Sequence, residues 1–594
     1  MQKHLAFIGL ASILVGGSSL TLVSPAQAQF QTRSLSVVYP PPQHSTSAEQ
    51  IFLIGTAPPE GQVVVNGQVI PRSPAGHFAP SFPLQIGENV FNLRYNDQTI
   101  TFKVTRVSNS PTIPSGVSFA PDSLTPERNI ARLPGETICF SAVAPPNAQV
   151  AVKLANETIP LLPKAGVTLP PNSAVLTFQN QPTTPEISPY LGCTRISQPG
   201  NLGTPTFQLS LNGRQVTQTS PAQVNILSPS QLQGIEVTAT EGVARTGTST
   251  NYSRLTPLPR GTRATVTGRE GDWLRLDYGA WIRENETQAI AGTVPPTSII
   301  RSISSREVLG ATEVVFPLQT PVPISIRQDD RSLTLTLHNL VAQTDTIFIR
   351  ESPVIKRLDW RQVTPETVEY TFNLKPEQQW GYNFRYEGTN LILSLAHPPQ
   401  VTGNLPLSGV EILLDPGHGG DELGARGPTG IPEKVVNLAV SKLLQQELLN
   451  RGATVYMTRE TDVAVSLRER MDLIDKLNPT IALSVHYNAL PDSGDAMNTA
   501  GIGMFWYHPQ AYSLAQFLHD YLVNNLNRPS YGVFWNNLAL TRPHSAPSVL
   551  MELGFMINPE EFEWIVNPQE QTQLARVLAD GIVEWLRQNT SERE

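Results

Sequence analysis

The chain has 594 residues, of which 52 are proline, and only 15% of its residues are charged. This length is too great for a single hydrophobic core and predicts about four or five domains. Many prolines and few charges favour short β elements separated by loops. A net charge of −8 leaves no basic surface of the kind that nucleic acid requires, so nucleic acid is excluded as a partner.

The first 28 residues have the pattern of a secretory signal peptide. Lys3 precedes an apolar run from Leu5 to Val23, and Ala26-Gln27-Ala28 supplies the small-residue cleavage motif. A transmembrane anchor is the alternative, but small residues from Gly16 to Ser19 interrupt the run and the cleavage motif follows at once. We therefore expect an exported protein without a transmembrane anchor, located in the periplasm or cell envelope.

The next part of the chain predicts a series of all-β domains. Period-2 alternation with turn signals predicts an immunoglobulin-like domain over 35–108, and weaker alternation predicts a second β domain over 115–232. Residues 234–302 resemble a bacterial SH3-like domain, and residues 303–400 resemble β domains of an envelope-targeting type. We expect these domains to place the protein on its target without supplying any catalytic group.

Two residue pairs in this β region each permit two interpretations. Trp273 and Trp281 would bind a ligand if exposed, but the sequence favours the alternative that both fill a small core. Cys139 and Cys193 are the only cysteines. In an oxidising compartment they could form a disulfide within the second β domain, but the sequence leaves their separation in space open.

After a linker, the pattern changes to alternating strands and helices over 408–590, which predicts an α/β domain. The apolar run Val410–Leu414 leads to a turn that carries His418, and the run Thr480–Val485 leads to His486. Between these two runs we expect a helix that begins at Glu433, a strand at 454–458, and a helix that is capped by Ser466 and Glu469 and ends at Leu477. After the second run we expect a strand at 502–507, a helix at 512–526, a strand at 548–551 that ends at Glu552, and a helix at about 570–588.

Four polar side chains thus fall near strand ends, where open α/β sheets build their sites. Two histidines and a carboxylate are a typical ligand set for a catalytic zinc ion, so His418, Glu433 and His486 are candidate ligands of one Zn2+. Glu552 interrupts an apolar run and would be largely desolvated there unless a metal or substrate needs it. We therefore assign Glu552 as the candidate general base.

Six ordered blocks carry a resemblance to a known family. They are Asp415-Pro416-Gly417-His418-Gly419-Gly420, Gly424-Ala425 with Gly427, Glu433-Lys434, Thr458-Arg459 with Asp462, Ser484 to Ala489, and Glu552-Leu553-Gly554-Phe555 with Asn558. Over residues 408–590 they resemble the zinc-dependent N-acetylmuramoyl-L-alanine amidases. Tyr487, where a small residue is common, and Ile557, where Ser is usual, depart from the pattern.

The resemblance implies that His418, Glu433 and His486 bind zinc and that Glu552 is the catalytic acid/base. The substrate would be peptidoglycan, cut between N-acetylmuramic acid and L-alanine, for cell-wall remodelling or daughter-cell separation. Asn488 and Arg542 are candidate substrate-binding residues, Arg542 as a partner for a carboxylate of the stem peptide. The sequence identifies no envelope or division protein as a partner.

Other functions would fit part of the sequence. A zinc carboxypeptidase or sugar deacetylase would share the metal chemistry, and a wall-binding protein with an inactive hydrolase domain would share the fold, but neither explains why all the blocks are intact and in order.

Residues 490–500 have a turn composition and are too short for a stable helix. No internal helix should therefore cover the metal site.

Overall fold

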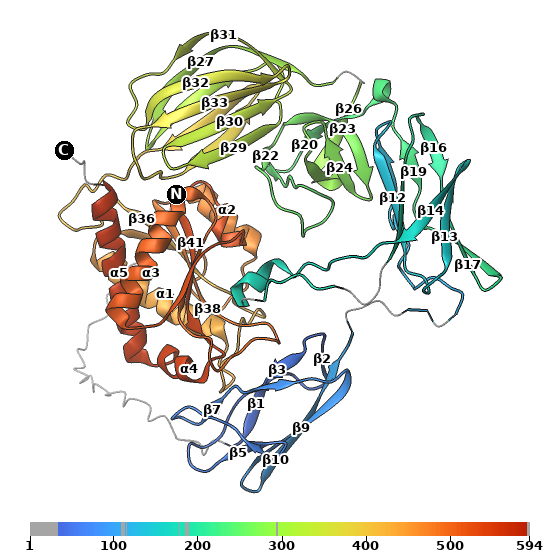
Figure 1. The fold of residues 1–594 in the computed structure, drawn as a ribbon. Coiled ribbons are helices and arrows are strands. Elements are labelled where there is room, and N and C mark those ends of the chain that lie inside the picture. Colours follow the sequence, from blue (N-terminus) through green and yellow to red (C-terminus); the bar gives the residue numbers. More distant parts are fainter. Residues whose placement is uncertain are drawn as a thin grey trace, which may run out of the picture.

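The computed structural model describes residues 34–590 except 109–112, 115, 178, 185–188, 293 and 294. The predicted signal peptide, 1–28, lies outside these described residues. The described chain is all-β up to residue 396 apart from short 3-10 turns, and an α/β domain follows (Figure 1). This confirms the predicted order of an all-β N-terminal region and a C-terminal α/β domain. No helix among the described residues is long and apolar enough to cross a membrane.

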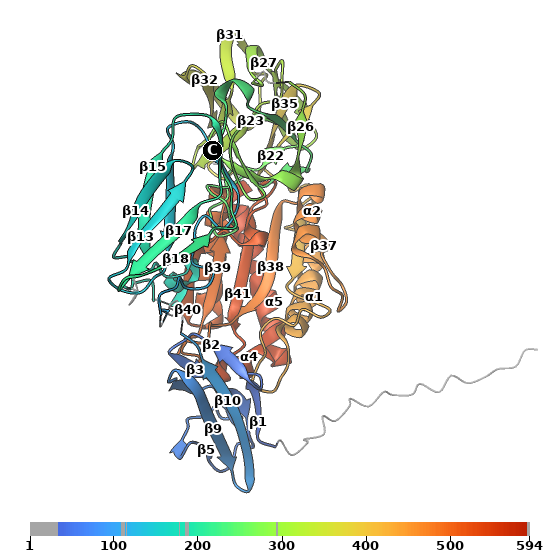
Figure 2. The same cartoon turned by 90° about the vertical axis from the view of Figure 1, so that its right-hand side faces the viewer.

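The first β unit has its own core and packs against the α/β domain (Figure 2). Its period-2 strands enclose Phe91, Leu93 and Val104, as alternation predicts. The strands are β1 (Ser36–Tyr39), β4 (Ile54–Thr56) and β7 (His77–Phe78) in one sheet, β2 (His44–Thr46), β10 (Gln98–Arg106), β9 (Gly87–Tyr95), β5 (Val63–Val65) and β6 (Gln68–Val69) in a second, and the pair β3 (Gln50–Phe52) and β8 (Ser81–Pro83).

The second β unit packs a six-stranded sheet against strands of a larger sheet. Its order is β12 (Thr137–Ala142), β15 (Tyr190–Arg195), β14 (Glu157–Pro163), β13 (Gln149–Leu154), β17 (Thr206–Leu211) and β18 (Arg214–Thr219). Phe140, Val152 and Phe207 of this sheet form one core with Ile130 and Val224 of the larger sheet. Between the neighbouring strands β14 and β15 the chain makes a long excursion that contains η1 (Asn172–Thr177).

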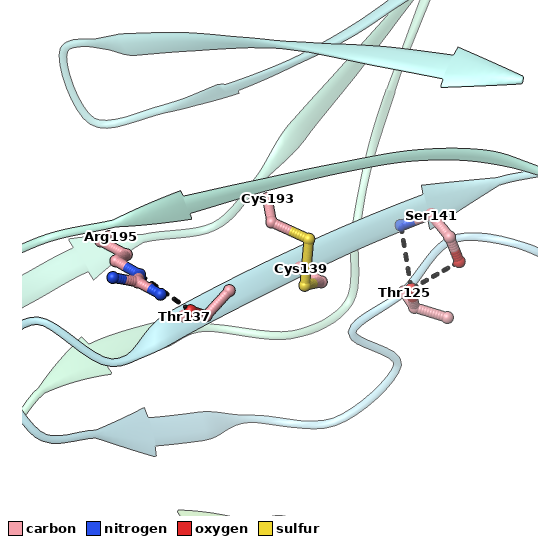
Figure 3. The surroundings of a disulfide bond; sticks show 6 residues. All are labelled: Thr125, Thr137, Cys139, Ser141, Cys193 and Arg195. Atoms are coloured by element: carbon pink, nitrogen blue, oxygen red, sulfur yellow. Dashed lines mark hydrogen bonds between the residues drawn. A yellow bond between two sulfur atoms is a disulfide. The ribbon is translucent and has the colours of Figure 1, made fainter. Parts of the chain in front are cut away.

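Cys139 and Cys193 form a disulfide in this unit. They lie directly opposite each other on the antiparallel strands β12 and β15, with Cα atoms 4.0 Å apart (Figure 3). The pairing that the sequence left open is therefore present. Because the bond closes a loop between residues 54 positions apart, it restricts the unfolded chain.

Replacing both cysteines by serine is expected to lower the free energy of unfolding of the second β unit by about 2–4 kcal/mol. Thermal unfolding of the oxidised wild type and of the double variant measures this difference. The reduced wild type should unfold together with the variant, and an equal midpoint for oxidised and reduced protein would contradict the prediction.

The larger sheet joins the second unit to the region predicted as SH3-like. Strand β11 pairs with β23, so one sheet crosses the predicted boundary between residues 232 and 234. The strand order of this larger sheet is β16 (Gly200–Gly203), β19 (Val224–Ile226), β11 (Ile130–Arg132), β23 (Arg263–Glu270), β20 (Gly234–Val237) and β26 (Thr287–Ile290), and β24 (Trp273–Leu276) and β25 (Trp281–Arg283) continue from β23. The strands β21 (Glu241–Gly242) and β22 (Leu258–Pro259) form a separate pair. The 3-10 turns of this region are η2 (Pro229–Gln231) and η3 (Glu284–Glu286).

Both tryptophans of this region are buried. Trp273 is 1% exposed and Trp281 is 9% exposed, and arginine guanidinium groups cover their rings. The interpretation as core residues is confirmed.

The last β unit is a sandwich of two sheets with a separate core that includes Phe316, Tyr370 and Phe372. One sheet has the order β31 (Leu340–Phe348), β27 (Ser298–Val308), β28 (Ala311–Pro317), β35 (Asn390–Ala396) and β34 (Tyr382–Glu387), and the other has β29 (Ile324–Asp329), β30 (Ser332–His338), β33 (Thr367–Leu374) and β32 (Ile355–Thr364). Strand β27 begins before the predicted boundary at residues 302 and 303, because its pairing with β31 starts at Ser298.

The α/β domain contains one six-stranded sheet. Its order is β37 (Thr454–Met457), β36 (Glu411–Pro416), β38 (Ile481–Asn488), β41 (Ser548–Phe555), β39 (Ile502–Trp506) and β40 (Ser530–Trp535), and β39 runs antiparallel to β41. The helical elements are α1 (Glu433–Asn450), α2 (Leu467–Leu477), α3 (Tyr512–Leu526), α4 (Pro559–Ile565), α5 (Pro568–Thr590), η4 (Pro509–Ala511) and η5 (Ala539–Thr541).

The two faces of this sheet are covered differently. Apolar residues of α1, α3 and α5 pack on one face and form the largest core of the protein (Figure 1). On the other face, Leu413, Ala482 and Leu550 pack against Ile474 of α2. Because β36, β38 and β41 are parallel, their carboxyl ends meet at one edge of the sheet.

Residues 490–500 lead away from this edge as a loop without a helix, as predicted. The first β unit holds this loop: Gln50 donates to the Ser493 carbonyl at 2.6 Å, and His44 lies 2.8 Å from Asp492. Phe52 and Ile54 form an apolar cluster with Phe555 and Ile557 of the α/β domain. The N-terminal β region therefore packs against the edge of the sheet that carries the candidate site.

Candidate metal centre and active site

Three of the predicted site residues come together at the carboxyl edge of the sheet. His418 follows β36, Glu433 begins α1, and His486 lies in β38. Their ligand atoms all lie within 4.8 Å of one another, and this is a group that could hold a metal ion. His418 Nε2 is 3.1 Å from Glu433 Oε2, and His486 Nδ1 is 3.0 Å from Glu433 Oε1.

These spacings fit a bound divalent metal. Two ligand atoms about 2.1 Å from a tetrahedral ion lie about 3.4 Å apart, close to the separations observed. The side chain of Glu433 is only 4% exposed, whereas His418 and His486 are 21% and 15% exposed. The cluster is therefore anchored on a buried carboxylate and retains access from one side.

Glu433 is held in its charged form. Burial alone would raise its pKa, but hydrogen bonds and charge from His418 and His486 outweigh burial and hold the pKa below its usual range. The backbone amides of Ala425 and Tyr487 donate to the same carboxylate at 2.9 and 3.1 Å. A metal ligand must be deprotonated, so these donors prepare Glu433 for that role.

The loop that carries His418 has an unusual backbone. His418 adopts a φ of 59°, in the left-handed region that most L-residues avoid. Its Nδ1 lies 3.1 Å from Glu422 Oε1, while Nε2 faces Glu433. A carboxylate on the second ring nitrogen fixes the orientation of a metal-binding histidine, and Glu422 is placed to do so.

Two buried arginines hold this loop in place. Arg459 donates to the carbonyls of Pro416 and Gly417, both at 2.9 Å. Arg470 donates to the carbonyls of Pro416 at 2.8 Å and His418 at 2.7 Å, and pairs with the Asp415 carboxylate. Three successive backbone carbonyls thus accept hydrogen bonds from charged guanidinium groups, and such bonds are stronger than those between neutral groups.

The Asp415–Arg470 pair is almost completely buried, at 1% and 2% side-chain exposure. Burial alone would raise the pKa of Asp415, but the charge of Arg470 and hydrogen bonds from Ser484 and Thr458 hold it below its usual range. Both hydroxyls donate to Asp415 at 2.6 Å.

Replacing Arg470 by Met is expected to lower the free energy of unfolding by about 3–5 kcal/mol, because Asp415 is left as an unpaired buried charge. Chemical denaturation measures this loss. The matched control is Arg468→Met on the same helix, where the guanidinium forms an exposed pair with Asp472. That control should change stability by no more than about 0.5 kcal/mol. Equal effects of the two substitutions would contradict the prediction.

Two glycines leave the space that the metal-binding side chains occupy. A Cβ on Gly417 would lie 2.2 Å from the His486 ring, and a Cβ on Gly424 would lie 2.4 Å from Glu433 Oε2. Neither contact is possible without displacing a candidate ligand. Both positions need glycine because the side chains of the three candidate ligands lie against the backbone there.

Glu552 lies next to the cluster. It is the direct partner of His486 in the parallel pairing of β38 and β41, although it lies inside β41 and not at its end as predicted. Its side chain is half-buried, and Oε2 is buried without a hydrogen-bond partner among the described residues. Burial, with a contribution from the Glu433 carboxylate, raises the pKa of Glu552 well above its usual range.

A β-bulge follows Glu552. The register shifts between His486 and Asn488, and Gly554 adopts a φ of 141°. Bulges of this kind redirect a side chain at the rim of a site. Asn488, at the end of β38, uses its side-chain oxygen to accept from the Ala489 amide at 2.8 Å.

Arg542 is not brought to the cluster. It follows η5 and precedes β41, whose first residue pairs with Ala482 at the amino end of β38. From Ser548 to Glu552 the strand spans about 13 Å, so Arg542 lies toward the opposite edge of the sheet. There its guanidinium donates to the Asn537 side chain at 2.6 Å. Arg542 is close to β41 in the chain, but the amino-terminal half of that strand separates it from Glu552.

Sequence patterns did not assign roles to the residues that support the site. Arg459 stands in a quoted block and Arg470 on a predicted helix, but nothing in either pattern indicated that both would turn inward to one loop. Tyr531 was also missed. A Cβ on Gly503 would lie 3.1 Å from the Tyr531 ring and 3.7 Å from Glu552, so Tyr531 borders Glu552.

Known proteins similar to this chain match its C-terminal part. The model of the family described as N-acetylmuramoyl-L-alanine amidase matches residues 412–584, which lie within the α/β domain. Among curated proteins, the probable cell wall amidase LytH of Staphylococcus aureus is 35% identical over 179 residues, 30% of this chain and 58% of that relative. The chain thus spans less than two thirds of the relative's length.

Solved structures give a match of similar extent. The N-acetylmuramoyl-L-alanine amidase AmiC2 of Nostoc punctiforme is 29% identical with a TM-score of 0.29, covering 30% of this chain and 99% of that chain. The N-acetylmuramoyl-L-alanine amidase from Clostridium difficile 630 is 27% identical with a TM-score of 0.29, covering 30% of this chain and 97% of that chain.

Proposed function

Since residues 412–584 form a domain of the N-acetylmuramoyl-L-alanine amidase family, we propose that the whole chain hydrolyses the amide bond between N-acetylmuramic acid and L-alanine in peptidoglycan. The reaction is zinc-dependent and serves cell-wall remodelling or daughter-cell separation. The observation that carries this proposal is the compact His418, Glu433 and His486 cluster with Glu552 in register beside it.

His418, Glu433 and His486 hold the zinc ion in this proposal. The donor set, the 3.0 and 3.1 Å separations and the space left by Gly417 and Gly424 all support this assignment. A zinc ion held there supplies a Lewis acid that polarises the scissile carbonyl and makes a bound water more acidic. Three protein ligands are the number typical of catalytic zinc sites.

Glu552 moves the proton. Within the described part of the chain its Oε2 has no hydrogen-bond partner, so it can accept a proton from the attacking water. The raised pKa of Glu552 favours holding that proton until the alanine nitrogen leaves and takes it. A bound cation would lower the pKa of Glu552, against the effects of burial and of the Glu433 carboxylate, so that the carboxylate could accept the proton and return it.

Asn488 remains the candidate for contact with the substrate, because it lies two residues beyond His486 at the end of the same strand. Arg542 lies away from the cluster, so its assignment to a stem-peptide carboxylate has no support in the geometry. The proposed site therefore consists of three ligands, one proton-transferring carboxylate and the rim around Asn488.

The N-terminal region adds affinity for the wall in this proposal. Export to the periplasm or cell envelope follows from the predicted signal peptide and gives the enzyme access to peptidoglycan. The packing of Phe52 and Ile54 against Phe555 and Ile557 goes beyond a tethering role, because it fixes the first β unit beside the site.

The products of digestion test the proposal. Incubation of purified sacculi with the full chain and zinc should release free stem peptides that begin with L-alanine and leave an intact glycan, as mass spectrometry of the soluble fraction will show. A chelator should abolish release and added zinc should restore it. Release of a single terminal amino acid would indicate a carboxypeptidase, release of acetate would indicate a deacetylase, and binding without any release would indicate an inactive domain.

A further inference from the structure

The excursion between β14 and β15 reaches across to the rim of the proposed active site. We name its described residues, 164–177 and 179–184, the arm. The arm leaves the second β unit between two strands that are already neighbours, so the fold of that unit does not require it. In both views the arm and its short helix η1 extend from the second unit to the α/β domain (Figures 1 and 2).

The arm docks beside β39 and β40. Leu176 packs against the apolar cluster on this face of the sheet, which includes Phe505 and Leu550. The Leu176 carbonyl accepts a hydrogen bond from the Tyr531 hydroxyl. Gln179 accepts one from Ser493 at 3.3 Å, in the loop that follows β38. The arm therefore touches both segments that border the carboxyl edge of the sheet.

These contacts place the arm one residue away from Glu552. The Tyr531 ring and the Glu552 side chain both approach the same point above Gly503. Burial, with a contribution from the Glu552 charge, raises the pKa of Tyr531. The arm does not seal the metal site, because His418 and His486 keep 21% and 15% exposure. The arm instead lies beside the site, next to Tyr531 and Ser493.

The exposed side chains of the arm have a definite chemistry. Lys164, at its base, is the only charged residue in 164–184. Near the tip, Val175 is 51% exposed and Asn172, Ser173 and Gln179 are also exposed. An uncharged surface of amide, hydroxyl and apolar groups complements sugars, which present hydroxyls, acetamido groups and apolar ring faces. A stem peptide with free carboxylates would instead require charged partners.

From this arrangement we propose that the arm binds the glycan strand next to the reacting N-acetylmuramic acid and makes the enzyme select longer strands. This rests on the proposed function. The second β unit thereby forms part of the substrate groove. A substrate with one disaccharide fills the site around Glu552, whereas a tetrasaccharide also reaches η1.

The test compares two substrates that carry the same stem peptide, a disaccharide and a tetrasaccharide, on the full zinc-loaded chain. The variant is Val175→Ser, because Val175 is exposed whereas Leu176 packs against the α/β domain. The chain offers a matched control in Val308→Ser, an exposed valine at the end of β27. Zinc content and thermal unfolding should be the same in all three proteins.

We expect the arm variant to raise KM for the tetrasaccharide about threefold to fivefold, from the loss of one apolar contact, and to change KM for the disaccharide less than about twofold. The control should change neither. An equal effect on both substrates, no effect, or faster turnover by the arm variant would overturn the proposal, the last by showing that the arm covers the site.

The same comparison by fluorescence anisotropy in a Glu552→Gln background separates this inference from the proposed reaction. Tetrasaccharide binding should weaken by the same factor when the arm is changed. If the wild-type chain cleaves neither substrate but binding still depends on the arm, the proposed reaction is wrong and the arm assignment stands. If binding is independent of the arm, the arm assignment is wrong.

Discussion

Replacing Glu552 by Gln is expected to lower turnover by about 100- to 10,000-fold and to leave zinc content unchanged. The amide has the shape of the carboxylate but cannot take the proton of the attacking water. Glu552 is not among the three clustered ligands, so its loss should not release metal. Peptide release from sacculi and zinc analysis of the same preparation measure the two quantities independently.

The control for this substitution is Glu460→Gln, the same chemical change at an exposed carboxylate of the α/β domain. It should keep the activity of the wild type. A Glu552→Gln protein with more than a few per cent of wild-type turnover would show that another group accepts the proton. Loss of zinc from this protein would show that Glu552 is a ligand.

Replacing Gly417 by Ala is expected to lower zinc affinity by at least about 10- to 100-fold, the range found when groups that orient a metal ligand are removed. The added Cβ would lie 2.2 Å from the His486 ring, so His486 must leave its position beside Glu433. Zinc affinity is measured by competition with a chelating dye, and activity should fall with zinc occupancy.

Gly116→Ala is the matched control, since a Cβ at Gly116 has nothing within 4 Å and neither glycine adopts a positive φ. It should bind zinc as the wild type does. If Gly417→Ala also keeps wild-type zinc affinity, then His486 either moves without cost or does not bind the metal.

Local patterns in the sequence were sufficient for most elements of the α/β domain. The capping box of Ser466 and Glu469 begins α2 as predicted, because both partners lie within one helical turn. Glu433 begins α1, and α3 spans the predicted 512–526. The edge strand β40 and the short helix α4 were missed, since neither has a strong periodic pattern of its own.

The sequence also determined the candidate metal ligands, because each one directly follows or opens an element that its own neighbours define. Residue types alone identified the chemistry of His418, Glu433 and His486. What remained open was whether they meet, and the parallel order of β36 and β38 with α1 between them brings them together.

Only the tertiary structure decided how the rest of the chain surrounds this site. The pairing of β11 with β23 joins two predicted domains, and the hydrogen bond from Tyr531 to Leu176 links residues 355 positions apart. Arg459 and Arg470 turn toward the His418 loop, while Arg542 points to the other end of the sheet. Local periodicity reports interactions within a few residues, whereas these contacts depend on how whole units pack, so no pattern in the sequence contains them.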